Sequence, residues 1–155
     1  MTLPAPASAS IDTISKQIIE QLQQDGRRSY ASIGKAVGLS EAAVRQRVQK
    51  LCESSVMQIV AVTNPLELGF TRQALISVVT DSQISATADR IAELPEVDYC
   101  VITTGSADIL AEVVCSGDED LLRVISTIRG LHGVLRTSTF TYLSLKKQEY
   151  NWGTR

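Results

Sequence analysis

The stretch that decides the fold is residues 29–52, SYASIGKAVGLSEAAVRQRVQKLC. It holds two short segments with apolar residues at helical spacing, separated by Gly38-Leu39-Ser40. The first is predicted to run from Tyr30 to Val37, and the second from Ser40 to about Ser54. In the second segment the apolar residues recur at i, i+4 and i+7, as Val44, Val48 and Leu51. Two short helices joined by a tight turn that contains glycine predict a helix-turn-helix.

The polar face of the second segment indicates what such a pair could bind. Ser40 is a good N-cap, and a helical wheel places arginine, glutamine and lysine opposite the apolar stripe. Arg and Gln recognise base edges, and Lys and Arg neutralise phosphates. The residues expected to contact double-stranded DNA are Arg27, Arg28, Ser40, Ala42, Arg45, Gln46, Arg47, Gln49 and Lys50. The alternative is an ordinary helical hairpin with a solvated polar face.

Charge is distributed unevenly along the chain. The net charge is −2, but residues 1–64 carry seven basic and five acidic side chains, whereas residues 65–155 carry eight basic and twelve acidic ones. A locally basic segment on an acidic body is the pattern of a DNA-reading domain fused to a domain of another kind. The charge asymmetry therefore favours the DNA-binding interpretation over the plain hairpin.

Several classes of protein are disfavoured by the composition. The three cysteines, Cys52, Cys100 and Cys115, share no CxxC spacing, so three buried free thiols in a reducing compartment are expected. His132 is the only histidine, and the chain has no P-loop, GxGxxG or GxSxG motif. We therefore expect no enzyme, no catalytic residues, no metal and no cofactor. The start shows no signal peptide and no apolar run long enough for a membrane, so a cytoplasmic, nucleoid-associated protein of a bacterium or archaeon is expected.

The chain divides into five segments by composition. Residues 1–10 are predicted to be a disordered tail, and residues 11–55 a helix-turn-helix domain that begins with a helix capped by Asp12. Residues 56–69 are predicted to be a linking strand, over Val56 to Val62, and a connector. Residues 70–147 form the second domain, and residues 148–155 are a tail that contains Trp152.

The second domain contains an internal repeat. Apolar strands from Ala74 and from Ala111 are each followed by a helix, a short turn and another strand. The first of these helices is predicted over Thr87 to Leu94, and the final strand over Leu135 to Leu145. Two such units in tandem give a ferredoxin-like βαββαβ domain. Its helices cover one face of the sheet, and the aliphatic open face is expected to pair with a second copy of the chain. The fold class predicted is α+β, with an N-terminal winged-type helix-turn-helix domain and a C-terminal ferredoxin-like βαββαβ domain.

Over residues 11–147 this order of elements resembles the leucine-responsive regulatory protein (Lrp/AsnC, feast/famine) family. The motifs that carry the resemblance are Asp25-Gly26-Arg27, Gly38-Leu39-Ser40, Asn64-Pro65 with Leu68-Gly69, Leu94-Pro95-Glu96-Val97 and Thr104-Gly105-Ser106-Ala107-Asp108. The resemblance implies a transcription factor that forms homodimers and higher oligomers. It also implies a small-molecule effector, an amino acid or related metabolite, bound by the C-terminal domain.

The resemblance places the effector at the turn between the second and third strands of that domain. The residues that it maps there are Thr103, Thr104, Gly105, Ser106 and Asp108. A turn with glycine offers backbone N–H groups to a carboxylate, and Asp108 could accept from an ammonium group. Gly and Asp are also ordinary hairpin-turn residues. The chain departs from the family at Ser106-Ala107, which leaves the effector open, and at Glu41-Ala42-Ala43, which leaves the operator open.

The function expected is a sequence-specific transcriptional regulator. Two recognition helices related by a two-fold axis would enter successive major grooves about 34 Å apart. An alternative with the same fold is a low-specificity, chromosome-organising DNA-binding protein. A metabolite sensor whose helix-turn-helix contacts only protein is the other alternative.

Overall fold

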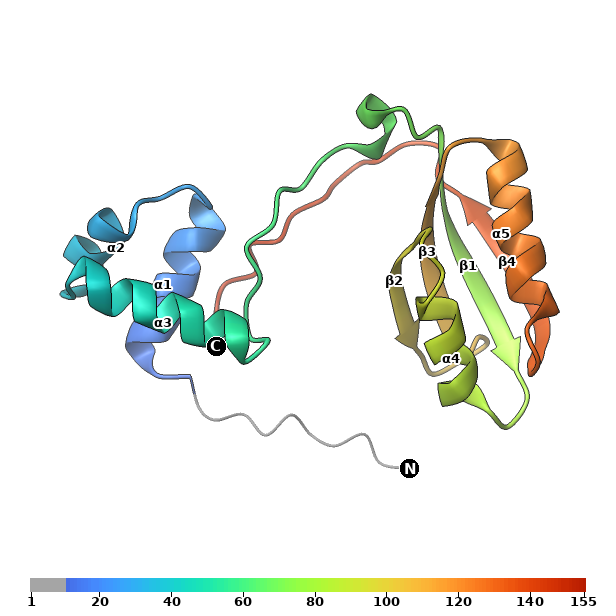
Figure 1. Ribbon diagram of the computed structural model, residues 1–155, viewed down its shortest axis with the longest axis horizontal. Coiled ribbons are helices and arrows are strands. Elements are labelled where there is room, and N and C mark those ends of the chain that lie inside the picture. The colour runs from blue at the N-terminus through green and yellow to red at the C-terminus, as the bar shows by residue number, and fades with distance from the viewer. Residues whose placement is uncertain (1–10) are drawn as a thin grey trace. The chain divides into compact units, whose positions relative to one another are not determined.

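The structure, a computed structural model, describes residues 11–155, so the disordered tail predicted at residues 1–10 lies outside the described residues. The chain folds into two compact units (Figure 1). One contains the described residues up to Ala61 together with Lys147–Arg155, and the other is Val62–Lys146. The C-terminal residues therefore group with the N-terminal helices.

The first unit is built on three helices, α1 (Thr13–Gln24), α2 (Tyr30–Val37) and α3 (Glu41–Glu53). Each begins after a side chain that accepts a hydrogen bond from the backbone N–H three residues later: Asp12, Ser29 and Ser40. Four fully or almost fully buried aliphatic side chains form the core between the helices: Ile18, Ile33, Val44 and Val48. The predicted helix-turn-helix is confirmed.

The turn between α2 and α3 depends on two glycines. Gly38 adopts a left-handed conformation, with φ of 73°, that ends α2. Gly34 lies against the turn, because a Cβ atom added there would lie 2.5 Å from the carbonyl oxygen of Leu39. The N–H of Leu39 also donates to the carbonyl of Gly34 at 2.9 Å. The close approach of the turn to α2 therefore leaves no room for a side chain at position 34.

The strand predicted over Val56 to Val62 is not formed. These residues belong to no strand of the described chain, and a short 3₁₀ helix, η1 (Pro65–Leu68), follows them. Val60 is 68% exposed, and its β-branched neighbours are also exposed. Such residues favour a strand only where a neighbouring strand pairs with them, and the described chain supplies none here.

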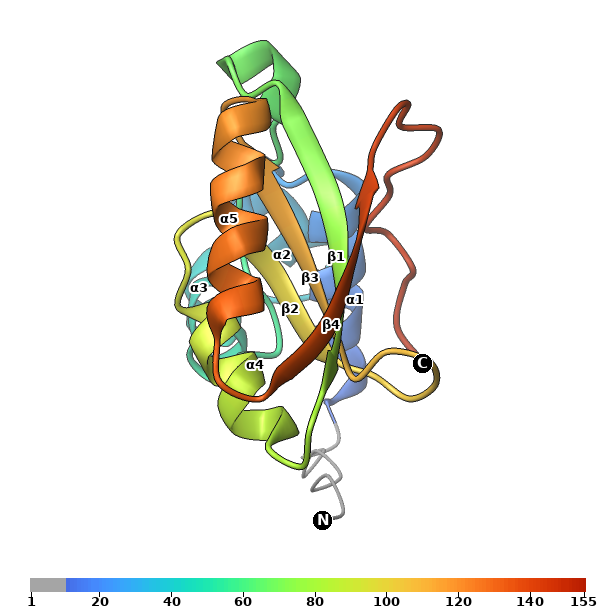
Figure 2. The ribbon, with the colours of Figure 1, turned by 90° about the vertical axis from the view of Figure 1, so that its right-hand side faces the viewer.

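The second unit contains a single four-stranded antiparallel sheet with two helices (Figures 1 and 2). Its elements in chain order are β1 (Arg72–Thr80), α4 (Ile84–Ala92), β2 (Val97–Ile102), β3 (Ile109–Cys115), α5 (Asp118–Gly130) and β4 (Val134–Thr141). The strand order is β2-β3-β1-β4. This is the ferredoxin-like βαββαβ arrangement that the sequence predicts.

Two elements differ in extent from the prediction. The last strand was expected to reach Leu145 but ends at Thr141, which pairs with Ala74 near the start of β1. One further bond, from the N–H of Tyr142 to the carbonyl of Gln73, lies one residue from the start of β1 at Arg72. Helix α4 begins at Ile84, three residues before the predicted start, after a turn in which the Asp81 carboxylate accepts from the N–H of Gln83 at 2.8 Å.

The cysteines also differ from the prediction that all three are buried. Cys115 is buried, Cys100 is partly buried, and Cys52, on the outer side of α3, is exposed.

Both helices of this unit lie on one face of the sheet (Figure 2). Alternate residues of β1 and β3 face the helices and form an aliphatic core whose fully buried members include Ile76, Val78, Ile109 and Val113. The intervening residues lie on the opposite face, which no other element of the second unit covers. We call this the open face; it carries Gln73, Leu75, Ser77, Val79, Tyr99, Val101, Leu110, Glu112, Val114, Arg136, Ser138, Phe140 and Tyr142.

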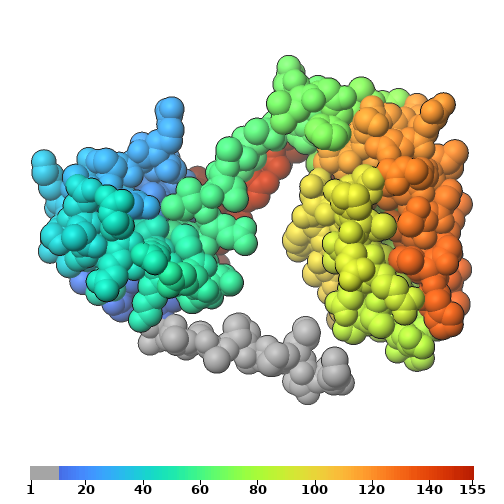
Figure 3. All heavy atoms as spheres, in the orientation of Figure 1, coloured from blue at the N-terminus to red at the C-terminus, as the bar shows by residue number. Residues whose placement is uncertain are grey.

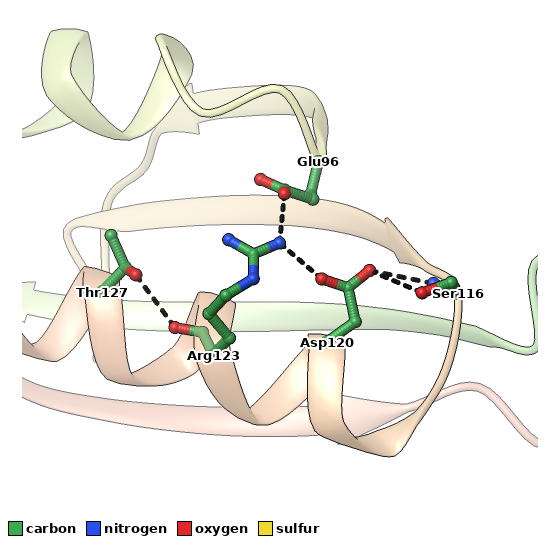
Figure 4. A network of polar contacts seen from close by, with 5 residues as sticks. All are labelled: Glu96, Ser116, Asp120, Arg123 and Thr127. Carbon is green, nitrogen blue, oxygen red and sulfur yellow. Dashed lines mark hydrogen bonds and ion pairs between the residues drawn. The ribbon is translucent and has the colours of Figure 1, made fainter.

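A polar network fastens α5 to the turn before β2 (Figure 4). The Arg123 guanidinium donates to both the Glu96 and the Asp120 carboxylates. Asp120 in turn accepts from the N–H of Ser116 at 3.0 Å, and this bond with the arginine contact holds the pKa of Asp120 below its usual range. The network joins the two βαβ halves and accounts for two of the carboxylates in the acidic C-terminal half.

Candidate DNA interface and effector turn

The outer surface of α3 is the candidate DNA interface. Val44 and Val48 pack with Ile18 of α1 and Ile33 of α2, and Leu51 on the same side of α3 is also buried, so the opposite side of α3 faces solvent. Helix α3 is the teal segment in Figure 3. Six predicted DNA-binding residues on or beside α3 are exposed: Ser40, Ala42, Arg45, Gln46, Gln49 and Lys50. Helical geometry thus brings these residues onto one surface, as the periodicity predicted.

Arg45 is held in place by two contacts. Its guanidinium donates to the Glu41 carboxylate, one turn earlier, at 2.8 Å. It also lies over the ring of Tyr30 from α2, 5.3 Å from the ring centroid. The sequence prediction did not assign Tyr30 a role in the site. A cation–π contact between the two helices restricts where the Arg45 side chain can reach.

Arg47 has a different environment. Its guanidinium donates to the Asp12 carboxylate at 2.6 Å and to the Ser15 hydroxyl at 3.0 Å, so it joins α3 to the start of α1. Hydrogen bonds from Arg47 and from the backbone of Ser15 lower the pKa of Asp12 to about 2. The side chain of Arg47 is 33% exposed, at the edge of the surface. Its partners within the unit indicate a structural role instead of the DNA contact expected for it.

The remaining polar residues differ in how free they are. The Gln49 amide donates to Glu53 at 2.8 Å. Within residues 11–155, no hydrogen bond or ion pair engages the side chains of Gln46 and Lys50, nor those of Arg27 and Arg28 in the turn between α1 and α2. These four side chains can therefore meet DNA without first breaking a contact in the protein.

The predicted effector turn joins β2 to β3. The N–H of Thr103 donates to the carbonyl of Asp108, and the Thr103 hydroxyl donates to the carbonyl of Ala107, both at 2.8 Å. Between them Gly105 has φ of 115°, a left-handed conformation that favours glycine. Thr104, Gly105 and Ser106 are exposed. The turn is thus closed at its base and presents three small residues at its tip.

Asp108, at the base of the turn, contacts the end of β1. Its carboxylate accepts from the N–H of Thr80 at 2.7 Å, and its own N–H donates to the carbonyl of Val78 at 2.9 Å. One carboxylate oxygen, Oδ2, therefore satisfies a backbone donor at the end of β1, and within residues 11–155 the other oxygen, Oδ1, accepts no hydrogen bond. Thr80 lies 28 positions earlier in the chain, and nothing in the local sequence marks the pair.

Among the residues that the structure describes, no group of three or more His, Cys, Asp or Glu side chains is placed to hold a metal ion. No helix within residues 11–155 has the length and apolar character that a membrane span requires.

A three-helix unit with an outward polar recognition helix, joined to a ferredoxin-like domain, defines a helix-turn-helix transcriptional regulator. Comparison with known families agrees with this class. The AsnC-type helix-turn-helix domain matches residues 11–51, and the Lrp/AsnC ligand binding domain matches residues 73–152. The chain belongs to the Lrp/AsnC family of transcriptional regulators.

The chain matches relatives of known sequence over nearly the whole length of those relatives. An HTH-type transcriptional regulator of Pyrococcus furiosus is 34% identical over 143 residues, which cover 90% of this chain and 97% of the relative. The HTH-type transcriptional regulator LysM of Sulfurisphaera tokodaii is 33% identical over 133 residues, covering 84% of this chain and 94% of LysM.

Solved structures share the fold. The leucine response regulatory protein LrpA of Mycobacterium tuberculosis superposes with a TM-score of 0.81 and 26% identity, over 88% of this chain and 95% of that one. A transcriptional regulator of Neisseria meningitidis, solved as a complex with L-methionine, gives a TM-score of 0.76 and 23% identity over 92% of this chain and 96% of its own.

Proposed function

We propose that this regulator binds specific DNA sequences as a homodimer and that an amino acid or related metabolite, bound by the C-terminal domain, changes its oligomeric state. The observation that carries the first part is the outer surface of α3. There Gln46 is free, Arg45 is held over Tyr30, and Lys50 lies one turn beyond Gln46. A surface that combines bidentate side chains with a lysine can both read bases and neutralise phosphates.

The residues divide by role within this proposal. Gln46, Gln49 and Arg45 are assigned to base edges, because glutamine matches adenine and arginine matches guanine. The contacts to phosphates are assigned to Lys50, Arg27 and Arg28. Ser40 and Ala42, at the start of α3, are assigned to positions close to the DNA backbone. Arg47 is assigned to holding α3 on α1, because Asp12 and Ser15 already occupy its guanidinium.

The exposed apolar side chains of the open face support a homodimer in which two chains pair through this face. Large apolar side chains stay exposed on that face, with Tyr99 at 58%, Phe140 at 56% and Tyr142 at 42% exposure. Aliphatic residues of the two central strands, such as Leu75 and Leu110, lie between them. Covering such a surface with a second copy removes apolar area from water and gives the two-fold symmetry that paired recognition helices need.

The effector part of the proposal is supported by the match to the Lrp/AsnC ligand binding domain and by the fold shared with the methionine complex. Within the turn, the backbone N–H groups near Gly105 and the hydroxyls of Thr104 and Ser106 are the groups that can meet a carboxylate. Asp108 is assigned to holding the turn against Thr80. Its other carboxylate oxygen is assigned to the ligand's ammonium group.

Selection from a random-sequence duplex library tests sequence specificity. The proposal expects an enriched motif with two-fold symmetry and half-sites about one helical turn apart. It also expects binding that resists competition by bulk DNA. Equal affinity for all duplexes would instead establish the low-specificity, chromosome-organising alternative, and no DNA binding at low salt would leave the metabolite-sensor alternative.

Thermal unfolding with each of the twenty amino acids tests the effector. A ligand at 100 times its Kd adds about 2.7 kcal/mol to the free energy of unfolding, enough for a clear rise in the midpoint. Sedimentation velocity with the active ligand then measures the change of oligomeric state. No shift with any amino acid, for an oligomer shown to be folded, would contradict amino-acid sensing.

A further inference from the structure

The last residues of the chain dock on the first helix of the DNA-reading unit. The Thr154 hydroxyl donates to the Glu20 carboxylate, and the Lys16 ammonium donates to the backbone oxygen of Arg155 at 2.5 Å. Lys16 and Glu20 are one turn apart on α1, so two adjacent tail residues bind one side of that helix. Gly153 and Thr154 are half-buried, whereas residues 141–152 are exposed throughout. The contact is therefore specific to the end of the tail.

The helix that receives the tail also fixes the recognition helix. Asp12 and Ser15, at the start of α1, bind the guanidinium of Arg47 on α3. Lys16, which binds the tail, directly follows Ser15 in the same turn of α1. A chain of contacts within one unit thus runs from Arg155 through α1 to Arg47.

The size of the unit makes such a contact consequential. Without the tail, its described part is only residues 11–61, and its central core consists of four buried aliphatic side chains. A domain of about 50 residues buries a small fraction of its surface and is marginally stable. Helices as short as α1 and α2 depend on tertiary contacts to stay formed. Added contacts on α1 therefore favour the arrangement in which α3 is presented correctly.

We propose that Gly153–Arg155 is a positioning element for DNA binding: docked on Lys16 and Glu20, it holds α1, and α1 holds α3 through Arg47. The proposal rests on the DNA-binding role of α3. Because the tail continues from β4, the chain of the second unit is joined to the DNA-reading unit at both ends, after Ala61 and before Lys147. The tail contacts are polar and lie at the surface, so they can open and close.

The test compares three single variants of the full chain. Thr154→Val keeps the shape of the side chain and removes the hydroxyl that donates to Glu20. Thr154→Ser keeps a hydroxyl, and Ser144→Val makes a comparable change in the exposed part of the tail, as a matched control. A fourth protein ends at Asn151 and lacks the docked residues altogether.

Three properties are measured for each protein: amide hydrogen exchange of α1 and α3, affinity for a selected duplex, and oligomeric state. Thr154→Val and the truncated protein are expected to exchange faster in α1 and α3 and to bind the duplex about three- to tenfold more weakly, because the competent arrangement is less populated. Thr154→Ser and Ser144→Val should match the unaltered protein in both measurements.

Unchanged exchange in α1 for both Thr154→Val and the truncated protein would overturn the proposal. A loss of DNA affinity that follows only from a changed oligomeric state would overturn it too, because the tail would then act between copies. If truncation unfolds the unit, the exchange of α1 and the DNA affinity of Thr154→Val alone test the proposal. Failure of the proposed regulatory function can be distinguished from failure of this inference. The unaltered protein would then show no sequence preference for DNA, whereas the hydrogen exchange of α1 would still report whether the tail holds that helix.

Discussion

The guanidinium of Arg47 donates a hydrogen bond of 2.6 Å to the carboxylate of Asp12, a residue 35 positions earlier in the chain. Asp12 is at the same time the N-cap of α1, where it accepts from the N–H of Ser15 at 2.7 Å. One carboxylate therefore starts the first helix and holds the recognition helix against it. This double use places a charged pair at the joint between α1 and α3.

Asp12→Asn isolates the charge pairing, because asparagine also serves as an N-cap. We expect the helical unit of Asp12→Asn and of Arg47→Gln to unfold at lower urea concentration at pH 7. The effects in the double variant should be less than additive, because either change alone removes the pair. Urea unfolding of the four proteins, followed by circular dichroism, measures this coupling; strictly additive effects would contradict it.

The same pair predicts a dependence on pH. The pKa of Asp12 is about 2 in the folded protein, against 3.8 ordinarily. Its pairing with Arg47 therefore makes its full contribution to the free energy of unfolding above about pH 4. The stabilisation is lost as the pH falls through 2. The difference in unfolding midpoint between the unaltered protein and Asp12→Asn should therefore shrink between pH 4 and pH 2. A constant difference across that interval would show that the carboxylate's charge is not involved.

Gly34→Ala should destabilise the helical unit although alanine is the better helix former by about 1 kcal/mol. The added Cβ would lie 2.5 Å from the carbonyl oxygen of Leu39, and backbone at the α2–α3 turn must move to relieve it. Overpacking of this kind costs about 1–3 kcal/mol in the free energy of unfolding. Gly130→Ala, at the end of α5, is the control: an added Cβ there meets no atom within 4 Å, so the change should be neutral or slightly stabilising. Equal stability of the two variants would contradict the close approach.

Local sequence signals predicted most of the fold. The cap at Ser40, the glycine at position 38 and the spacing of Val44, Val48 and Leu51 all act within one or two helical turns, so α2 and α3 were predicted almost to the residue. The repeat in the second half similarly predicted the order of β1 through β4.

What the sequence did not predict depends on partners that are distant in the chain. Arg47 and Asp108 have the residue types of binding groups, but Asp12 and Thr80 engage them inside the protein. The strand expected over Val56 to Val62 has the right residue types and lacks a neighbouring strand in the described chain. Whether a polar group is free or occupied is decided by tertiary contacts, which periodicity and spacing do not encode.

Gln46→Ala and Lys50→Ala should affect DNA binding in different ways. Loss of a glutamine that reads a base should reduce discrimination between the selected site and a single-base variant by about 1–3 kcal/mol, while binding to unrelated DNA is retained. Loss of a lysine on a phosphate should weaken binding to all duplexes and lower the slope of log K against log salt by about 0.9. Titrations of each variant with the two duplexes at several salt concentrations separate these effects, and an equal loss for every duplex with both variants would contradict the division.

Glu112 is the one acidic residue at the centre of the open face, on β3 between Leu75 and Tyr99. Gln73 donates to its carboxylate at 2.8 Å, and burial together with this carboxylate raises the pKa of Tyr142 beside it. Because β3 is a central strand, a second copy that covers the face also covers Glu112, and removing its charge from water opposes association.

Glu112→Gln should therefore tighten the dimer, by about 1–2 kcal/mol in the free energy of association, because glutamine fills the same space without a charge. Sedimentation equilibrium at pH 7 measures the dissociation constant. Glu119→Gln, an exposed change of the same kind on α5 and so on the helical side of the sheet, is the matched control and should leave the constant unchanged. If neither variant alters association, the chains do not pair through the open face; if Glu112→Gln weakens it, the carboxylate pairs with a cation of the second copy.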